Sequence, residues 1–299
     1  MKEILMIKGA DTVVNVCAGI KEGEKVLIIT EPKMVKIAKI IATAVYSAKA
    51  EPVLSVMLPR ISDGQEPPAI ISKSMKECDA FISVVDKSIT HTNAVVDAVR
   101  SGSRGIMLTQ FNEDMLISGG LEADFVEAKE VCIKIAKILE NGKEIHLTTP
   151  FGTDLKFSAT GRRGNALYCM VEPGEFSPVP TVEANVSPLE NTSEGTIVAD
   201  ASIPYIGIGI LDEPVQFKVE NGKIYSITGG KQAKILKENL ESKNDSNVYN
   251  IAEMGIGLNP KCRFTGFMLE DEGVFGSVHI GIGTSITLGG TVEAACHYD

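Results

Sequence analysis

The sequence contains no tryptophan, few other aromatic residues and fewer basic than acidic side chains. Aromatic residues make up 5% of the 299 residues, and the formal net charge at pH 7 is -10. Proteins that bind nucleic acid need basic surfaces for the phosphates and aromatic rings for the bases. Nucleic acid is therefore not expected as a partner.

Closely spaced cysteines are also missing. The chain has six cysteines, which lie far apart, and no CxxC pair occurs. A disulfide framework and a thiolate zinc site both depend on such spacing, so neither is predicted. Most of the cysteines are interpreted as small, buried apolar residues.

Long apolar runs are absent as well. No segment reaches about 18 consecutive apolar residues, the length that a membrane-spanning helix requires. The first residues, MKEILMIKGADTVV, carry charges among the apolar side chains and no cleavage site of small residues. These features predict a cytoplasmic protein without a membrane span.

Two groups of well-known functional motifs do not occur. The sequence has no GxGxxG and no P-loop, the glycine-rich patterns that bind nucleotide phosphates. It also has no GxSxG turn for a serine nucleophile. A nucleotide cofactor and a serine hydrolase are therefore not predicted.

The first half of the chain alternates between two kinds of segment. Apolar, largely β-branched runs at 25–30, 52–58, 80–85 and 105–110 predict strands, and stretches between them, such as 34–48, repeat apolar residues at helical spacing. Strands separated by helices indicate a parallel sheet with helices on its faces. The expected fold class is therefore α/β.

A helix predicted over 121–142 closes this first region, because acidic residues stand in its first part and a glycine ends it. From Glu144 onward the sequence changes to short strands with frequent glycine, among them 195–203. Asn221-Gly222 lies between two alternating runs and is a strong hairpin signal. One amphipathic helix is predicted over 231–243.

A chain of 299 residues exceeds the usual size of a single domain. We therefore predict two domains. The first, 1–142, is a parallel α/β domain, and the second, 143–299, is a β-rich α+β domain.

The last fifty residues hold three side chains that can bind metal: His279 in GSVHIGIG, and His297 and Asp299 in ACHYD. Residues at i and i+2 of an extended segment point to the same side, so His297 and Asp299 can reach one ion. Glu253 in NIAEMGIGLNP and Glu175 in EPGEFSP add oxygen donors. Mixed nitrogen and oxygen donors suit zinc, iron(II), cobalt or manganese. A metal site in the second domain is predicted from these five residues.

Other polar residues receive a structural interpretation. The run from Glu270 to Glu272 is typical of an acidic turn. His91 and His146 lack acidic partners at a useful spacing in the sequence and are interpreted as structural or surface residues.

A series of short motifs runs through nearly the whole chain: GIKEGEKVLI, FGTDLKFSATGRRG, PGEF with SEGTIVADASI, AEMGIGLNP, GSVHIGIG, and the ending from LGG to CHYD. Together these motifs resemble the thermophilic leucyl aminopeptidase family, the aminopeptidase T and S metallopeptidases. The resemblance implies two divalent ions, zinc or cobalt, held by Glu175, Glu253, His279, His297 and Asp299. It also implies a homodimer that acts on small peptides.

In such an enzyme the paired ions activate a water molecule and polarise the scissile peptide carbonyl. The resemblance assigns the bridging of the ions, or the transfer of a proton, to Glu253 or Glu175. The expected reaction is therefore the release of N-terminal residues from peptides.

Two other functions stay open. The same superfamily resembles the 2,5-dihydroxypyridine 5,6-dioxygenases, ring-opening enzymes in which a single iron(II) ion would bind His279, His297 and Asp299. Glu175 would then orient the site without touching the ion, and the substrate would be a small molecule. The third possibility is a binding protein whose site has degenerated and holds no metal.

Overall fold

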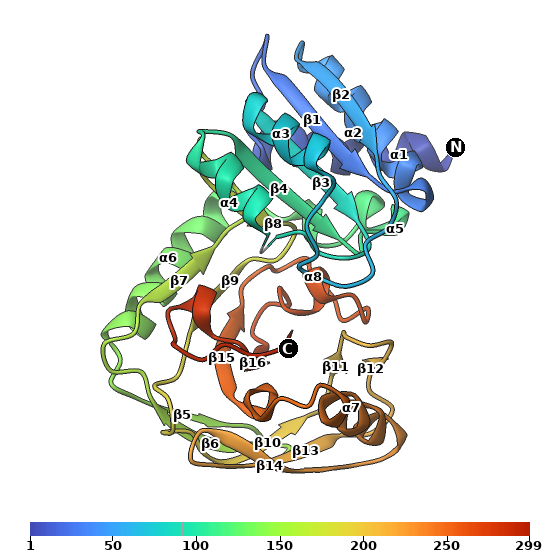
Figure 1. The fold of residues 1–299 in the computed structure, drawn as a ribbon. Coiled ribbons are helices and arrows are strands. Elements are labelled where there is room, and N and C mark those ends of the chain that lie inside the picture. Colours follow the sequence, from blue (N-terminus) through green and yellow to red (C-terminus); the bar gives the residue numbers. More distant parts are fainter. Residues whose placement is uncertain (91) are drawn as a thin grey trace. The chain divides into compact units, whose positions relative to one another are not determined.

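The computed structural model describes residues 1–90 and 92–299, which form two compact units. The first unit comprises Met1–Ala128, Leu167–Thr181 and Pro260–Cys262, and the second comprises Lys129–Ala166, Val182–Asn259 and Arg263–Asp299. The predicted α/β class is confirmed, because one five-stranded parallel sheet is combined with antiparallel sheets (Figure 1).

The first unit is built on a sheet with the strand order β2-β1-β3-β4-β8, in which all neighbours are parallel. Helices α3 and α4 pack against each other, as do α1 and α2. The elements of this unit are α1 (Lys2–Asp11), η1 (Thr12–Cys17), β1 (Lys25–Thr30), η2 (Pro32–Met34), α2 (Val35–Ser47), β2 (Glu51–Val56), α3 (Ala69–Glu77), β3 (Ala80–Val85), α4 (Asn93–Arg100), β4 (Arg104–Thr109), α5 (Glu113–Ile117), η3 (Gly120–Glu122) and β8 (Phe176–Pro178).

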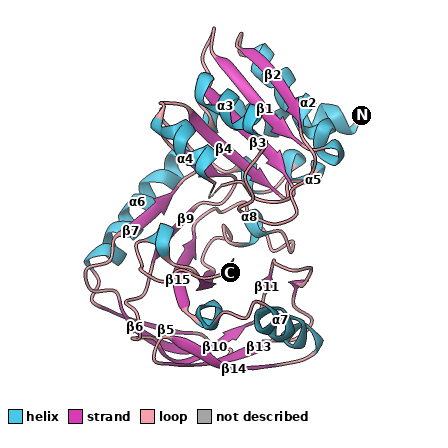
Figure 2. Ribbon diagram, in the orientation of Figure 1, coloured by secondary structure: helices cyan, strands magenta, loops and turns pink. Residues whose placement is uncertain are grey.

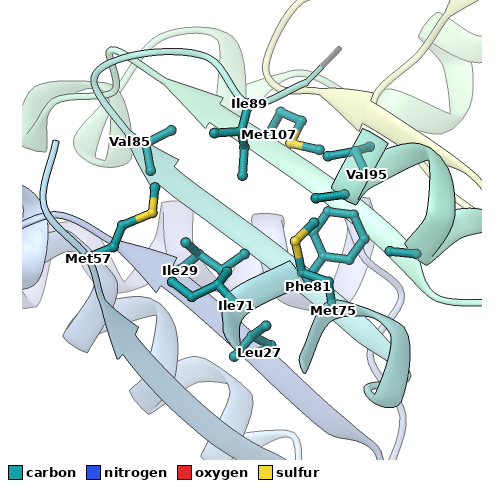
Figure 3. Close-up of a cluster of buried hydrophobic side chains, with 12 residues drawn as sticks. Leu27, Ile29, Met57, Ile71, Met75, Phe81, Val85, Ile89, Val95 and Met107 are labelled. Carbon is teal, nitrogen blue, oxygen red and sulfur yellow. The ribbon is translucent and has the colours of Figure 1, made fainter. Parts of the chain in front are cut away.

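The core of this unit lies where α3 and α4 cover the sheet (Figure 3). Every residue of β3 and of β4 is buried, as expected for central strands of a parallel sheet. Phe81 on β3 and Met107 on β4 are buried together with Met75 on α3 and Val95 on α4. Burial of these apolar side chains stabilises the unit.

The edge strand β8 comes from a distant part of the chain. Its three residues pair in parallel with Gly105–Met107 of β4. This pairing places residues 167–181 in the first unit. A three-residue strand carries too little periodicity to be predicted from the sequence.

The second unit contains two five-stranded sheets and one short hairpin (Figure 2). The strand orders are β14-β13-β10-β6-β5, β17-β16-β15-β9-β7 and β11-β12. The elements are α6 (Phe125–Asn141), which enters this unit at Lys129, β5 (Glu144–Thr148), β6 (Asp154–Ser158), β7 (Gly164–Leu167), β9 (Glu183–Val186), β10 (Glu194–Ala199), β11 (Ser202–Ile203), β12 (Gly209–Ile210), β13 (Val215–Glu220), β14 (Lys223–Thr228), α7 (Lys231–Ser242), η4 (Ser246–Tyr249), β15 (Ile251–Gly257), α8 (Met268–Asp271), β16 (Val278–Gly283), η5 (Ile286–Leu288) and β17 (His297–Tyr298).

The hairpin at Asn221-Gly222 is present between β13 and β14. Both residues have positive φ, 50° and 76°, as a type I′ turn requires. The strand predicted over 195–203 is interrupted, because β10 follows β13 only as far as Ala199. The chain then turns, and β11 pairs with β12 instead.

The two compact units differ from the two continuous segments predicted as domains. Residues 129–142 group with the second unit and residues 167–181 return to the first. The division of the chain into domains 1–142 and 143–299 stays a prediction about independent folding. Among the described residues, no helix is both long and apolar enough to cross a membrane.

Candidate metal centre

One face of the sheet β17-β16-β15-β9 gathers the acidic and imidazole side chains. Residues that stand opposite each other in antiparallel strands point to the same face. In this sheet four of the polar residues stand opposite a glycine. The pairs are Glu183 with Gly257, Glu253 with Gly281, His279 with Gly255, and His297 with Gly283.

These glycines leave the space that the polar side chains fill. A Cβ atom added at Gly255 would lie 2.0 Å from Nε2 of His279. At Gly281 it would lie 2.7 Å from Oδ1 of Asp299 and 2.8 Å from Cβ of Glu253. Since real Cβ atoms do not approach other atoms so closely, the motifs AEMGIG and HIGIG need glycine for the site to form.

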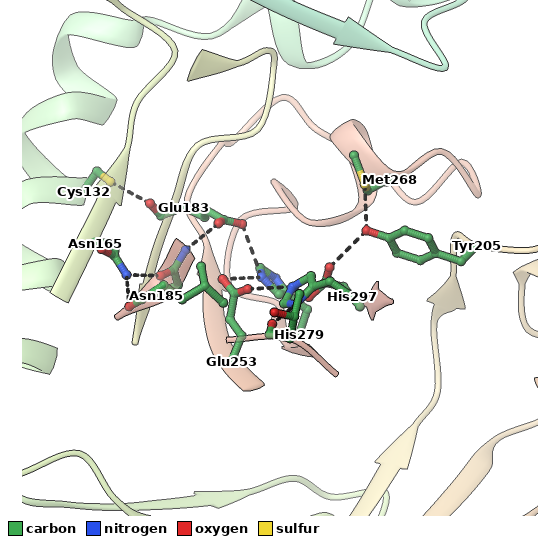
Figure 4. Close-up of polar contacts among 12 residues, drawn as sticks. Cys132, Asn165, Glu183, Asn185, Tyr205, Glu253, Met268, His279 and His297 are labelled. Carbon is green, nitrogen blue, oxygen red and sulfur yellow. Dashed lines mark hydrogen bonds and ion pairs between the residues drawn. The ribbon is translucent and has the colours of Figure 1, made fainter. Parts of the chain in front are cut away.

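Glu253 lies at the centre of the cluster, and its side chain is 5% exposed. Its Oε1 lies 3.8 Å from Nε2 of His279, and its Oε2 lies 3.1 Å from Nε2 of His297 (Figure 4). Each carboxylate oxygen therefore faces a different imidazole. A carboxylate in this arrangement can contribute one oxygen to each of two neighbouring cation sites.

The orientation of His297 is set by the backbone. Its Nδ1 lies 2.8 Å from the carbonyl oxygen of Thr284. A carbonyl only accepts hydrogen bonds, so Nδ1 carries the proton and donates it. Nε2, which lies 3.5 Å from Oδ1 of Asp299, is then the nitrogen available to a metal ion, as in many histidine ligands.

Glu183 forms the other end of the cluster. Its Oε2 lies 3.3 Å from Nε2 of His279. Its Oε1 accepts a hydrogen bond of 2.8 Å from Nδ2 of Asn185, and Asn165 donates in turn to Oδ1 of Asn185. This chain of side-chain amides fixes the carboxylate of Glu183 (Figure 4).

Two overlapping sets of donors result. Within the described part of the chain, the donor atoms of Glu183, Glu253 and His279 lie within 4.8 Å of one another, as do those of Glu253, His297 and Asp299. Oε2 of Glu183 and Oδ1 of Asp299 are buried and have no hydrogen-bond partner among the described residues. Buried oxygens of this kind, beside imidazole nitrogens, fit a divalent cation.

The pKa values of Glu183 and His279 show how strongly the groups interact. Burial raises the pKa of Glu183 to about 7, although the imidazole of His279 acts in the opposite direction. Burial acts to lower the pKa of His279, but the carboxylates of Glu183 and Glu253 outweigh it and raise this pKa to about 9. The carboxylates therefore favour positive charge between them.

The pKa values at the end of the cluster formed by His297, Asp299 and Glu253 shift for the same reasons. Burial acts to lower the pKa of His297, but Asp299 and Glu253 raise it well above its usual value. Burial acts to raise the pKa values of Asp299 and Glu253, but the imidazoles lower both. Buried charges need such compensation, and a bound cation supplies it as protons do.

The structure does not bring Glu175 into either donor set. Glu175 is exposed, belongs to the first unit and precedes β8. Its carboxylate accepts a hydrogen bond of 3.0 Å from the backbone N–H of Glu172, and its own carbonyl accepts one from Gly105. The pairing of β8 with β4 therefore determines where this glutamate lies.

Glu183 is the residue that the sequence interpretation missed. It lies in TVEANV, where Val182, Ala184 and Val186 are buried. A glutamate and an asparagine two residues apart on an apolar strand is the signal that was available. Such a strand buries a charge, which is costly without a partner.

The other acidic residues that the sequence analysis singled out belong to neither donor set. The acidic turn expected over 270–272 is partly helical, because Glu270 and Asp271 end the helix α8 and only Glu272 lies in the following turn; Asp271 accepts backbone hydrogen bonds from Thr265 and Gly266. His146 is an exposed residue, as the sequence interpretation expected, and the β5–β6 hairpin brings Asp154 within 2.8 Å of its Nε2. His91 lies outside the described residues.

A cavity of about 490 Å³ within the second unit adjoins the centre. His279 and Asp299 contribute to its wall, together with apolar side chains such as Phe151, Phe217 and Phe264. Its volume lies in the range of small-molecule sites, roughly 300–1,000 Å³. The donor cluster is therefore accessible from a cavity that can hold a small organic molecule.

Comparison with known proteins identifies related sequences. The family described as 2,5-dihydroxypyridine 5,6-dioxygenase matches residues 6–299. The 2,5-dihydroxypyridine 5,6-dioxygenase of Pseudomonas putida KT2440 is 26% identical over 179 residues, which are 54% of this chain and 49% of the relative. The aligned region thus spans about half the length of this curated relative.

Two solved structures are similar in fold. The 2,5-dihydroxypyridine dioxygenase from P. putida KT2440 has a TM-score of 0.82 at 18% identity, covering 98% of this chain and 90% of the other. AmpT from Thermus thermophilus has a TM-score of 0.71 at 15% identity, covering 100% and 92%. At these identities the likeness shows the fold alone.

Proposed function

Since this chain belongs to the 2,5-dihydroxypyridine 5,6-dioxygenase family, we propose that it is a metal-dependent dioxygenase that opens the ring of a small hydroxylated heteroaromatic compound. The observation that carries the proposal is the family match over residues 6–299, which includes every residue of the donor cluster. The cavity beside the cluster supports it, because the apolar walls suit a small planar ring.

The expected membership in the aminopeptidase T and S family is corrected by the family match. The fold similarity to AmpT agrees with a shared superfamily, and its sequence identity of 15% supports no closer link. The chain is thus a member of an enzyme family, and hydrolysis is the second candidate for its function.

The donor atoms fit an iron(II) ion at the end formed by Glu253, His297 and Asp299. This set combines one imidazole with two carboxylates, and the unpartnered Oδ1 of Asp299 and the oriented Nε2 of His297 face each other. The predicted triad included His279 in place of Glu253, but His279 lies in the other donor set. A bound iron(II) ion would supply the activation of dioxygen.

The residues around the ion have separate tasks. The carbonyl of Thr284 holds the proton on Nδ1 of His297. Phe151 and Phe264 in the cavity wall would offer apolar surface to the substrate ring. Asp299 and His279 place the polar end of the cavity beside the donors, so that hydroxyl groups of the substrate are oriented towards them.

A metallohydrolase is the second candidate, and one observation favours it. The two donor sets share Glu253, whose two oxygens face different imidazoles. Two ions bridged in this way, about 3.5–4 Å apart, are used in hydrolysis. Zinc or cobalt would then fill both positions, and small peptides would be the substrates. A site that holds no metal would leave only a binding function.

Metal content and oxygen dependence separate these candidates. The protein is loaded anaerobically with iron(II), zinc or cobalt and assayed with 2,5-dihydroxypyridine and with a leucyl anilide. The proposal expects oxygen consumption and loss of the pyridine absorbance with iron alone. Anilide hydrolysis without oxygen, with zinc or cobalt near two ions per chain, would replace it by the hydrolase. Failure to bind any of the three metals would leave the binding protein.

A further inference from the structure

Tyr205 reaches the donor cluster from a part of the second unit outside its sheet. It follows β11 in the hairpin β11–β12. Its hydroxyl lies 3.1 Å from Oδ2 of Asp299 and 2.8 Å from Sδ of Met268 (Figure 4). Its ring lies against that of Tyr298, with the ring centres 4.9 Å apart.

The two oxygens of Asp299 have different surroundings. Oδ2 accepts the hydrogen bond from Tyr205, whereas Oδ1 is buried, has no hydrogen-bond partner among the described residues and lies 3.5 Å from Nε2 of His297. A hydroxyl has a single hydrogen to donate, and a carboxylate is a stronger acceptor than a thioether sulfur. The hydroxyl therefore holds Oδ2 and leaves Oδ1 facing the donors.

The backbone of the hairpin supports this position of Tyr205. The N–H of Ile208 bonds to the carbonyl of Tyr205 at 3.0 Å, and the two residues between them, Ile206 and Gly207, have φ of 50° and 78°. Isoleucine is rare at positive φ, because its branched side chain is crowded there. A turn that accepts this conformation next to Tyr205 indicates that the position of the ring matters.

Tyr205 does not contribute to the wall of the cavity, although its neighbours Pro204 and Ile203 do. Its hydroxyl is thus directed at a metal ligand and away from the space for substrate. Hydrogen bonds from residues behind a ligand orient it and tune the affinity for the ion.

We propose that Tyr205 is the positioning residue of Asp299, whose hydroxyl holds Oδ2 so that Oδ1 is presented to the bound cation. The proposal rests on the metal centre of the proposed function. It assigns Tyr205 a role in binding the ion that is separate from any role in stabilising the fold.

Zinc affinity of the full chain tests this role, because zinc accepts the same nitrogen and oxygen donors and undergoes no redox change. The affinity is measured by competition with a chromophoric chelator for wild type and for Tyr205→Phe. We expect Tyr205→Phe to bind zinc about 10- to 100-fold more weakly, with a melting temperature of the metal-free protein close to that of wild type.

Tyr298→Phe is the matched control. The hydroxyl of Tyr298 donates to Oδ1 of Asn239, away from the donors, and the residue also adjoins Asp299 in the chain. This variant is expected to stay within about twofold of wild type, because the hydroxyl that it removes bonds to Asn239, which belongs to neither donor set. Met268→Leu removes the second acceptor of the Tyr205 hydroxyl and is expected to leave zinc affinity unchanged or tighter.

The outcomes separate the proposals. If wild type binds no zinc, the metal centre itself fails. If wild type binds zinc and Tyr205→Phe binds it equally well, or if Tyr298→Phe weakens binding as much, the positioning role is refuted. If Tyr205→Phe does not fold, the zinc affinity of Met268→Leu tests the proposal instead. This variant keeps the hydrogen bond from Tyr205 to Asp299, so a tenfold loss of zinc affinity would show that packing, and not this bond, holds the ligand.

Discussion

The parallel sheet of the first unit buries apolar side chains on both faces, whereas glycines in the sheet β17-β16-β15-β9 leave space for charged side chains. Residues of β3 and β4 are all buried, and Phe81 and Met107 fill the core. On each of β15 and β16 the face towards the polar cluster carries one charged residue followed by two glycines, and each charged residue stands opposite a glycine of the other strand. Both donor sets found among the described residues lie in the second unit.

The strands of the two sheets therefore contribute to the protein in different ways. In the first unit, side-chain volume supplies stability through burial. In the second, the absence of side chains at Gly255 and Gly281 lets several charged groups meet at distances of 3 to 4 Å. Buried charges cost free energy unless they are compensated, so the second sheet depends on a cation or on protons for part of its stability.

The largest change in stability is expected from Phe81→Ala. Truncation of a fully buried phenylalanine removes apolar contacts and leaves a cavity, which costs about 3–5 kcal/mol. Urea denaturation measures the loss. The control is Phe275→Ala, whose ring is 61% exposed and whose removal is expected to cost less than about 0.5 kcal/mol. Equal losses would contradict the assignment of the core to the first unit's sheet.

The same substitution in the two sheets gives the sharpest contrast. In Gly105→Ala the new Cβ lies 2.3 Å from the ring of Phe81, so the free energy of unfolding is expected to fall by about 1–3 kcal/mol. In Gly255→Ala the Cβ lies 2.0 Å from Nε2 of His279, and the displaced imidazole is expected to reduce zinc affinity about 100-fold.

Thermal denaturation of the metal-free proteins and zinc competition are measured for both variants. Zinc binding at wild-type affinity in Gly255→Ala would show that the glycine is not required by the donors. A loss of zinc affinity in Gly105→Ala would show that the core of the first unit and the centre are not independent.

A smaller effect is expected from substitution of two glutamates, the ligand Glu175 predicted from the sequence and Glu183, which the structure places in a donor set. Glu183→Gln removes a charged oxygen from a donor set and is expected to weaken zinc binding about tenfold. Glu175→Gln alters an exposed side chain of the first unit and is expected to change the affinity by less than about twofold. Isothermal titration with zinc compares them. The reverse ranking would restore Glu175 as the ligand.

Much of the fold follows from local sequence pattern. The strands β1 to β4 and the helix α2 lie within a few residues of the predicted ranges, because apolar periodicity reports directly on which face is buried. The hairpin at Asn221-Gly222 follows from turn geometry. The strand β8 and the assignment of residues 167–181 to the first unit could not be predicted, because they depend on pairing between distant segments.

The candidate site, too, could be predicted from the sequence only in part. One sheet brings the two histidines, Asp299 and Glu253 into one cluster, but His279 and the pair His297 and Asp299 belong to different donor sets, whereas the sequence interpretation placed them around one ion. Glu175 and Glu183 are eight residues apart, and only the pairing of β8 with β4 and of β9 with β15 separates them into different units. Tyr205 contacts Asp299 across 94 residues of sequence, so no local pattern identifies it.

The most direct test of the metal centre is the ratio of metal to protein after loading with iron(II) or zinc, measured by mass spectrometry in wild type and in His297→Ala. The imidazole of His297 lies between Glu253 and Asp299, so its removal takes the only nitrogen from that donor set. We expect at least about one ion per chain in wild type and a clear loss in the variant. Less than about half an ion per wild-type chain, or equal loading of the two proteins, would contradict the account.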